Sequence, residues 1–210
     1  MTALTAAALV GLGYLLGSLP FGYWLPRALV GVDIRTVGSG NTGATNVWRA
    51  LGFKLGLSVA LLDIAKGAAA ALVARWLADD LVAVLAGVAA MIGHWRPVFL
   101  GGAKGGKMVA TTGGVGLALA FFPTLAAAGI WIATFLLTRY ASVASIIAAA
   151  TLPFLAFSLG ATTPVLGFTI AAALAVLVLH RTNIQRLRAG KENRFKLRRR
   201  AVARAPSQTA

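Results

Sequence analysis

The sequence predicts an all-α polytopic membrane protein, a bundle of about seven transmembrane helices. Of its 210 residues, 59% are hydrophobic and only 12% are charged, and the mean hydropathy is +0.82. Such a chain is too apolar for a soluble domain and too long for a single span. A net charge of +15 would suggest nucleic acid in a soluble protein, but most of the basic residues lie between apolar segments or in the tail. They are better explained as topology signals, so we expect no nucleic-acid partner.

Seven apolar segments account for the bundle. They cover residues 4–24, 55–77, 81–92, 109–122, 125–137, 143–159 and 165–179. Residues 17–22 should loosen the first segment, and Pro123 should divide the fourth from the fifth, because glycine and proline weaken a helix. With the amino end outside and the carboxyl end cytoplasmic, only Lys66 and Arg75 of the 20 basic residues are not accounted for on the cytoplasmic side.

The segments form one expected unit. We predict a single integral-membrane catalytic domain over residues 1–189 and a basic cytoplasmic tail over residues 190–210, partly disordered. No lysine or arginine precedes the first apolar segment, so it lacks the basic region of a cleaved signal peptide and is expected to be kept. The absence of cysteine excludes disulfides, thiolate catalysis and cysteine-bound metals.

A polar stretch at residues 38–49 lies between the first two segments. It contains three glycines, two amides and three hydroxyls, and it ends at Arg49. Glycine lets backbone N–H groups converge, hydroxyls add donors, and an arginine can bind an anion with two parallel hydrogen bonds. This composition favours a phosphate site, and the alternative is an ordinary turn rich in loop-forming residues.

Two further polar stretches, residues 94–107 and 180–192, carry both histidines of the chain. Lys104 and Lys107 flank two glycines, which suits phosphate, but the full nucleotide-binding pattern is missing and lipid headgroup contacts are the alternative. His180 follows the last segment, where either acid/base chemistry or capping of the helix is expected. A cationic pocket beside a lipid-filled bundle is typical of a site for a phosphorylated lipid substrate.

Residues inside the apolar segments leave other functions open. Asp63 and Lys66 lie three apart on one helical face and should neutralise each other. Ser142 and Ser145 share a helical face, where a hydroxyl usually bonds back to its own helix. A transporter or flippase for a phosphorylated solute is the rival class, although no matching pair of broken helices marks a site at the membrane centre. A structural lipid-binding protein is the third.

Three motifs resemble those of the PlsY family of acyl-phosphate:glycerol-3-phosphate acyltransferases. They are residues 38–47, residues 93–107 around Gly93-His94 and Lys104-Gly105-Gly106-Lys107, and residues 180–190 beginning His180-Arg181-Thr182-Asn183. Residues 17–22 and 63–67 also look similar, so the resemblance covers about a third of the chain, in the order of the family. The second loop departs from the family pattern in length and in having Met108 where glycine is usual.

The resemblance implies a seven-helix enzyme of the bacterial inner membrane with its active site facing the cytoplasm. Its reaction moves a fatty acyl group from acyl phosphate to the sn-1 hydroxyl of glycerol 3-phosphate, giving lysophosphatidic acid and phosphate, the first acylation step of phospholipid biosynthesis. Its partners would be acyl phosphate, glycerol 3-phosphate and the lipid bilayer. No cofactor and no metal are expected, because an acyl phosphate carries its own good leaving group and needs orientation more than a covalent nucleophile.

The resemblance also assigns roles to residues. His180 and Asn183 would be catalytic, orienting the attacking hydroxyl. Ser39, Arg49 and either Lys104 or Lys107 would hold the phosphate of glycerol 3-phosphate. The donor phosphate and the surrounding site would use Asn41, Gly43, Thr45, Asn46, His94, Gly105, Gly106, Ser142, Ser145 and Glu192. Neither histidine has an acid at the spacing of the His-x-x-x-x-Asp acyltransferases, since Phe99 and Gln185 occupy those positions. A thioester donor is therefore disfavoured.

Overall fold

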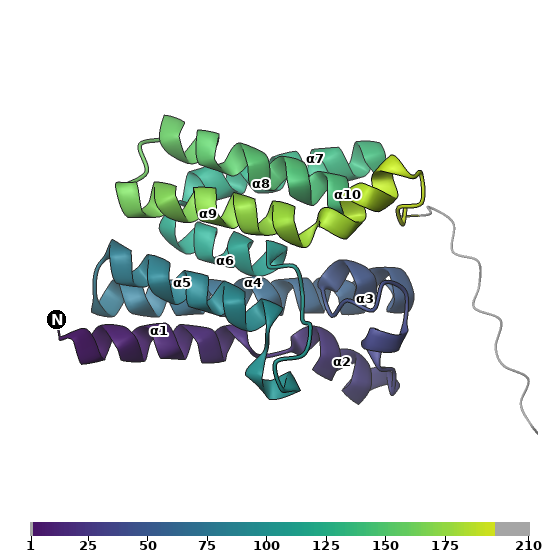
Figure 1. The fold of residues 1–210 in the computed structure, drawn as a ribbon, viewed down its shortest axis with the longest axis horizontal. Helices are drawn as coiled ribbons and strands as arrows, with labels where there is room; N and C mark the ends of the chain where they lie inside the picture. The colour runs from purple at the N-terminus through teal and green to yellow at the C-terminus, as the bar shows by residue number, and fades with distance from the viewer. Residues whose placement is uncertain (1, 196–210) are drawn as a thin grey trace, which may run out of the picture.

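The structure, a computed structural model, describes residues 2–195, in which the regular elements are all helical. The helices are α1 Ala3–Gly17, α2 Phe21–Val30, α3 Ala44–Leu51, α4 Phe53–Leu77, α5 Asp80–Trp95, α6 Val109–Leu119, α7 Phe121–Thr138, α8 Ala141–Ser158, α9 Thr163–Leu179 and α10 Arg181–Arg188, with 3-10 turns at η1 Ile34–Thr36 and η2 Val98–Leu100. The long helices run side by side, and the short helices α2, α3 and α10 gather at the end opposite the amino terminus (Figure 1). The polar stretches therefore meet at one end of the bundle.

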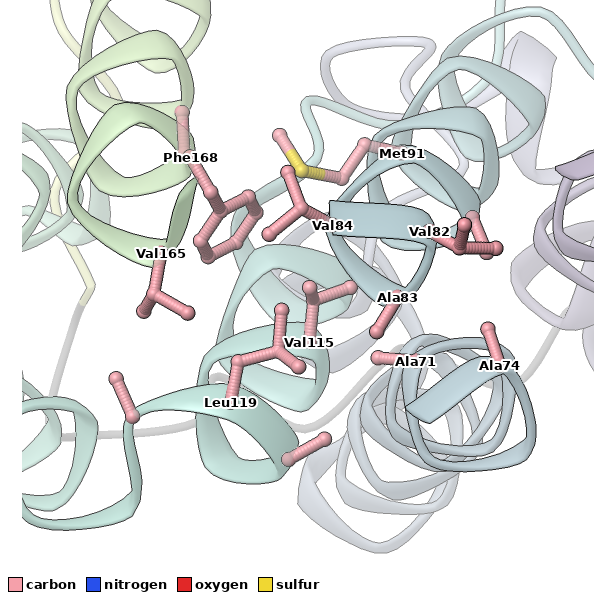
Figure 2. Packing of buried hydrophobic residues seen from close by; sticks show 14 of the residues in the cluster. Ala71, Ala74, Val82, Ala83, Val84, Met91, Val115, Leu119, Val165 and Phe168 are labelled. Carbon is pink, nitrogen blue, oxygen red and sulfur yellow. The ribbon is translucent and has the colours of Figure 1, made fainter. Parts of the chain in front are cut away.

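Small side chains hold the first half of the bundle together. Ala71 and Ala74 of α4 face the α5 helix around Ala83, and Val115 of α6 and Phe168 of α9 complete the buried cluster (Figure 2). Alanine and glycine let helices approach closely, and helix association in a membrane depends on such packing because lipid is as apolar as the side chains. Helix α6 thereby packs against α4, α5 and α9.

The predicted apolar segments are all helical, and the first is interrupted where the sequence predicted. α1 ends at Gly17, and α2 starts at Phe21 after Pro20. Within residues 2–195, five helical segments are long and apolar enough to cross a membrane, counting α1 with α2, and α9 with α10 gives a sixth. Helix α6 is apolar but shorter. The all-α membrane fold is confirmed, while the number of crossings and the orientation of the termini stay predictions.

The predicted break between the fourth and fifth segments was wrong in position. Helix α6 ends at Leu119 and α7 begins at Phe121, so the break falls at Ala120. Pro123 lies within the first turn of α7. A proline is tolerated there because the first backbone N–H groups of a helix have no carbonyl partner within the helix.

The two basic residues that the topology did not explain are both paired with carboxylates. Lys66 Nζ lies 2.8 Å from the Asp63 carboxylate, as predicted, and donates a 2.7 Å hydrogen bond to the Leu19 carbonyl in the gap between α1 and α2. In the last turn of α4, Arg75 Nε lies 3.2 Å from the Asp80 carboxylate. The buried pair thus also satisfies a carbonyl that the interrupted helix leaves free.

Candidate active site

A single cavity of about 650 Å³ joins the three polar stretches at the end of the bundle where α3 and α10 lie. Twelve of the predicted site residues line it: Ser39, Asn41, Gly43, Thr45, Arg49, His94, Lys107, Ser142, Ser145, His180, Asn183 and Glu192. Four predicted residues, Asn46, Lys104, Gly105 and Gly106, do not. Residues far apart in the sequence, such as Arg49, Lys107 and Asn183, can therefore contact one ligand.

Asn46 holds the glycine-rich loop from behind. Its side chain is 2% exposed, and its Oδ1 accepts a 2.9 Å hydrogen bond from the Ser39 backbone N–H. Its Nδ2 donates to the Val37 and Asn41 carbonyls at 3.0 and 2.9 Å. Gly38 beside it has a φ of +64°, and a Cβ there would overlap Asn46 Oδ1. The polar side-chain atoms of Asn46 thus all bond to this loop, and Asn46 does not line the cavity, so its predicted contact with substrate stays a prediction.

The first turn of α3 faces the cavity. Asn41 Oδ1 accepts a 2.8 Å hydrogen bond from the Gly43 N–H just before the helix, and Gly43, Ala44 and Thr45 all line the cavity. The first N–H groups of a helix have no carbonyl partner within it, and the helix dipole adds positive potential at this end. Together with the Thr45 hydroxyl, this turn offers donors to an anion.

The second loop is fixed from the interior by His94. Its carbonyl accepts a 3.0 Å hydrogen bond from the Gly106 N–H, and its Nδ1 lies 3.5 Å from the Asp63 carboxylate. The imidazole lies so close to Gly106 that any Cβ there would overlap the ring. The Asn41 Nδ2 then donates a 3.0 Å hydrogen bond to the Gly105 carbonyl. Gly105 and Gly106 therefore shape the loop and join it to the first polar stretch without lining the cavity.

Of the two lysines that the sequence left as alternatives, Lys107 faces the cavity. Its ammonium group donates to Asn183 Oδ1. Lys104 is exposed and lies outside the cavity lining. Burial, assisted by the positive charge of Arg186, lowers the pKa of Lys107 to about 8. The structure thus favours Lys107 as the cation that meets a ligand.

His180 and Asn183 lie where α9 turns into α10. His180 Nδ1 lies 2.8 Å from the Val176 carbonyl. Because a carbonyl only accepts, Nδ1 carries the proton, and in the neutral ring Nε2 is left as an acceptor. Asn183 accepts from Lys107 and donates to Glu192 at 2.7 Å. The arrangement can orient a hydroxyl group and accept its proton.

Glu192 is engaged by protein groups around it. It accepts hydrogen bonds from Asn183, from Ser142 at 2.9 Å and from Arg186 at 2.8 Å. Burial raises the pKa of the carboxyl group, but these hydrogen bonds outweigh it, and the pKa of Glu192 lies below its ordinary value. Glu192 therefore stays ionised and fixes the third stretch. Glu192 lines the cavity, and its predicted contact with substrate stays a prediction.

Arg49 has donors to spare. Within residues 2–195 its buried Nε has no hydrogen-bond partner. Burial lowers the pKa of Arg49, with Glu192 acting against the shift, yet a guanidinium starts so high that it remains charged. The Arg49 guanidinium stacks on the Phe195 ring, whose centroid lies 4.7 Å from the guanidinium carbon. A half-buried cation with a buried, unused N–H beside a cavity is a strong candidate for binding an anion.

Below its polar end the cavity becomes an apolar groove. Its walls come from α4, α6, α7 and α8 and include Leu57, Ile64, Val109, Ala128, Ile132, Ala148 and Leu152. Along α7 the lining extends from Leu136 to Thr124, a helical rise of about 18 Å. Ser145 faces this groove but, as expected, bonds back to the Ala141 carbonyl at 2.8 Å and also accepts from Trp131 at 3.0 Å. The groove is suited to an extended alkyl chain.

The sequence reasoning missed an aromatic cluster at the mouth of this groove. The cluster, Trp48, Phe53, Trp131, Phe135 and Phe195, packs with ring centroids 4.8 to 5.4 Å apart. Trp131 and Phe135 are four residues apart, a spacing that could have been read as one helical face. The sequence around Phe195 gave no sign that this residue belongs to the cluster, because residues 190–210 were predicted to be a tail.

This chain is similar to proteins described as glycerol-3-phosphate acyltransferases. The family described as glycerol-3-phosphate acyltransferase matches residues 7–190. A glycerol-3-phosphate acyltransferase of Desulforudis audaxviator (strain MP104C) is 47% identical over 199 residues, covering 94% of this chain and all of the relative. One from Synechococcus sp. (strain CC9902) is 48% identical over 193 residues, covering 91% and 96%.

Two solved structures are also similar to this chain over 91% of its length and 96% of theirs. Both are crystal structures of PlsY, described as an integral membrane glycerol 3-phosphate acyltransferase. The glycerol 3-phosphate form is 43% identical with a TM-score of 0.87, and the lysophosphatidic acid form is 42% identical with a TM-score of 0.85.

Proposed function

Because the chain belongs to the glycerol-3-phosphate acyltransferase family, we propose that it transfers a fatty acyl group from acyl phosphate to the sn-1 hydroxyl of glycerol 3-phosphate. The products are lysophosphatidic acid and phosphate. The observation that carries this proposal is the single cavity that combines a cationic polar end with an apolar groove. One end suits two phosphate groups, and the other suits a fatty chain.

Glycerol 3-phosphate occupies the polar end in this proposal. Arg49 and Lys107 bind its phosphate, with Ser39 adding a donor. Both cations line the cavity, and the free Nε of Arg49 supports the assignment. The glycerol hydroxyl then lies against His180 and Asn183. Charge-assisted hydrogen bonds of about 1.5 to 3 kcal/mol each supply most of the binding free energy.

The donor lies with its phosphate at the first turn of α3 and its chain in the groove. The N–H groups of that turn and the Thr45 hydroxyl bind the phosphate. Ser142 also lines the cavity, but its single O–H donates to Glu192 and is not available to the phosphate in this arrangement. The apolar walls on α7 and α8 then surround the chain. This arrangement brings the donor carbonyl between the α3 turn and His180.

The chemistry needs no covalent enzyme intermediate. The sn-1 oxygen attacks the acyl carbonyl carbon, the carbon–oxygen bond to phosphate breaks, and phosphate leaves with the electron pair. The hydroxyl proton passes to His180 Nε2 or to a phosphate oxygen of the donor. Because the leaving group is already good, orientation of the two substrates and stabilisation of developing negative charge supply most of the acceleration.

The proposed location is the bacterial inner membrane, with the polar end of the cavity facing the cytoplasm. The loops and short helices at this end carry Arg49, Lys104, Lys107 and Arg181, and Lys54 lies in the first turn of α4. Basic residues concentrate on the cytoplasmic side of bacterial membrane proteins. Glycerol 3-phosphate, a water-soluble anion, then enters from the cytoplasm, and the fatty donor enters from the bilayer.

Offering three donors side by side tests the reaction. Purified protein with glycerol 3-phosphate and a metal chelator is expected to form lysophosphatidic acid from acyl phosphate, and little from acyl-CoA or acyl-carrier protein. Product is measured by mass spectrometry, with heat-treated protein as the control. Formation from a thioester alone would overturn the donor assignment. No product until a metal is supplied would overturn the expectation that the reaction needs no metal.

The affinity for glycerol 3-phosphate is expected to fall above pH 8. Lys107, with its pKa near 8, is charged below that pH and neutral above it, so the attraction for a phosphate dianion is lost as pH rises. KM measured between pH 7 and 9.5 should therefore rise through about pH 8. In Lys107→Arg, whose cation does not titrate in this range, the rise should disappear. An identical pH profile in both proteins would exclude Lys107 from phosphate binding.

A further inference from the structure

The chain beyond α10 folds back over the polar end of the cavity. We call residues 192–195 the C-terminal strap. It is held at the α7–α8 turn, where the Phe195 backbone N–H donates a 2.9 Å hydrogen bond to the Arg139 carbonyl and the Arg194 side chain donates a 3.2 Å bond from Nε to the Thr138 carbonyl. Glu192 fixes the other end of the strap to Ser142. The strap is thus attached at two points on one side of the cavity.

The Phe195 ring packs against rings of α7 and α3. Its centroid lies 5.0 Å from the Phe135 ring of α7 and 4.8 Å from the Trp48 ring of α3. Both partners line the cavity, and their own rings are in contact, with centroids 5.4 Å apart. Aromatic rings at these separations gain about 0.5 to 1.5 kcal/mol per pair beyond the area they bury. Phe195 therefore packs onto the contact between α3 and α7 and adds to it.

Phe195 also contacts the cation that the proposed function uses. The Arg49 guanidinium carbon lies 4.7 Å from the ring centroid, within the range of a cation–π interaction. A ring against the face of a guanidinium leaves the N–H groups at its edge free to bind an anion. Arg49 follows Trp48 in α3, so the same ring fixes both the helix turn and the side chain that it carries.

We propose that Phe195 is a positioning residue that holds the Arg49 guanidinium in place for the phosphate of glycerol 3-phosphate. This inference rests on the proposed role of Arg49. Phe195 itself donates nothing to the substrate. Without its ring, Arg49 samples several rotamers, and binding of the phosphate must then order it at a cost in affinity. The acyl transfer step, once both substrates are bound, is unchanged.

Full-length Phe195→Leu tests the inference. Leucine keeps an apolar side chain but removes the aromatic face. KM for glycerol 3-phosphate is expected to rise about five- to tenfold, or about 1 to 1.4 kcal/mol, with kcat and the KM for acyl phosphate within twofold of the parent. Phe195→Tyr should restore the parent KM, because the ring is kept. Phe157→Leu, at a side chain that is 73% exposed on α8, is the matched control and should change nothing.

Pairing the substitution with a change at Arg49 separates positioning from packing. If Phe195 acts through Arg49, Phe195→Leu should change the KM of an Arg49→Ala protein by less than twofold. An equal rise in both backgrounds, or no rise in Phe195→Leu alone, would overturn the inference. Binding of glycerol 3-phosphate measured without donor distinguishes this from failure of the proposed reaction: weaker binding in Phe195→Leu supports positioning whichever donor the enzyme uses.

Discussion

Arg49→Ala is expected to raise the KM for glycerol 3-phosphate about a hundred- to ten-thousandfold. An arginine can give a phosphate two charge-assisted hydrogen bonds, each worth about 1.5 to 3 kcal/mol, and alanine removes both. The structure leaves Arg49 with a buried Nε that has no partner within residues 2–195. Steady-state kinetics with glycerol 3-phosphate as the varied substrate measures the loss, and the KM for acyl phosphate should change far less.

Two variants make the Arg49 result specific. Arg49→Lys keeps the charge but not the planar pair of donors, so its KM should lie between those of the parent and Arg49→Ala. Arg188→Ala removes an exposed arginine of α10 that does not line the cavity, and it should behave as the parent. A KM within twofold of the parent in Arg49→Ala would exclude Arg49 from the phosphate site.

His180→Ala is expected to lower kcat by about a hundredfold or more, because general base catalysis by a positioned histidine typically contributes that much. The hydrogen bond from Nδ1 to the Val176 carbonyl leaves Nε2 free to accept the hydroxyl proton. His180→Asn is the matched control: its amide can still donate near the Val176 carbonyl but supplies no basic nitrogen. Both variants should lose kcat to a similar extent.

The division of the loss between kcat and KM decides the role of His180. A loss confined to KM for glycerol 3-phosphate would mean that His180 only positions the hydroxyl, and that the donor phosphate takes the proton. A near-normal kcat in His180→Asn together with a low kcat in His180→Ala would assign the effect to support of the turn between α9 and α10. Melting temperatures of the purified variants identify any general loss of folding.

Much of the candidate site could be predicted because the residue types that bind anions lie close together in the sequence. Glycines beside hydroxyls and Arg49 indicated an anion site, and the charge of Asp63 inside an apolar segment indicated the pairing with Lys66 that the structure shows. Hydropathy located the helices, because a bilayer admits few alternatives to them. The break at Ala120 was misplaced because proline was taken as the end of a helix, whereas Pro123 occupies a first turn.

The features of the site that the sequence did not predict depend on contacts between distant segments. Asn46 was predicted to bind substrate, yet each of its polar atoms bonds to the backbone of its own loop, a distinction that requires coordinates. The choice between Lys104 and Lys107 depended on how the second loop folds over His94. Phe195 lies beyond the predicted catalytic domain, whose boundary at residue 189 stays a prediction. Residues 196–210 of the predicted tail lie outside the described residues.

The central claim is that the three polar stretches together form one phosphate-binding end of one cavity. A structure of this protein with glycerol 3-phosphate bound tests it most directly. The phosphate is expected within about 3 Å of donor atoms of Arg49 and Lys107, with the sn-1 hydroxyl within reach of His180. A phosphate bound elsewhere, or contacted by only one of the three stretches, would contradict the account.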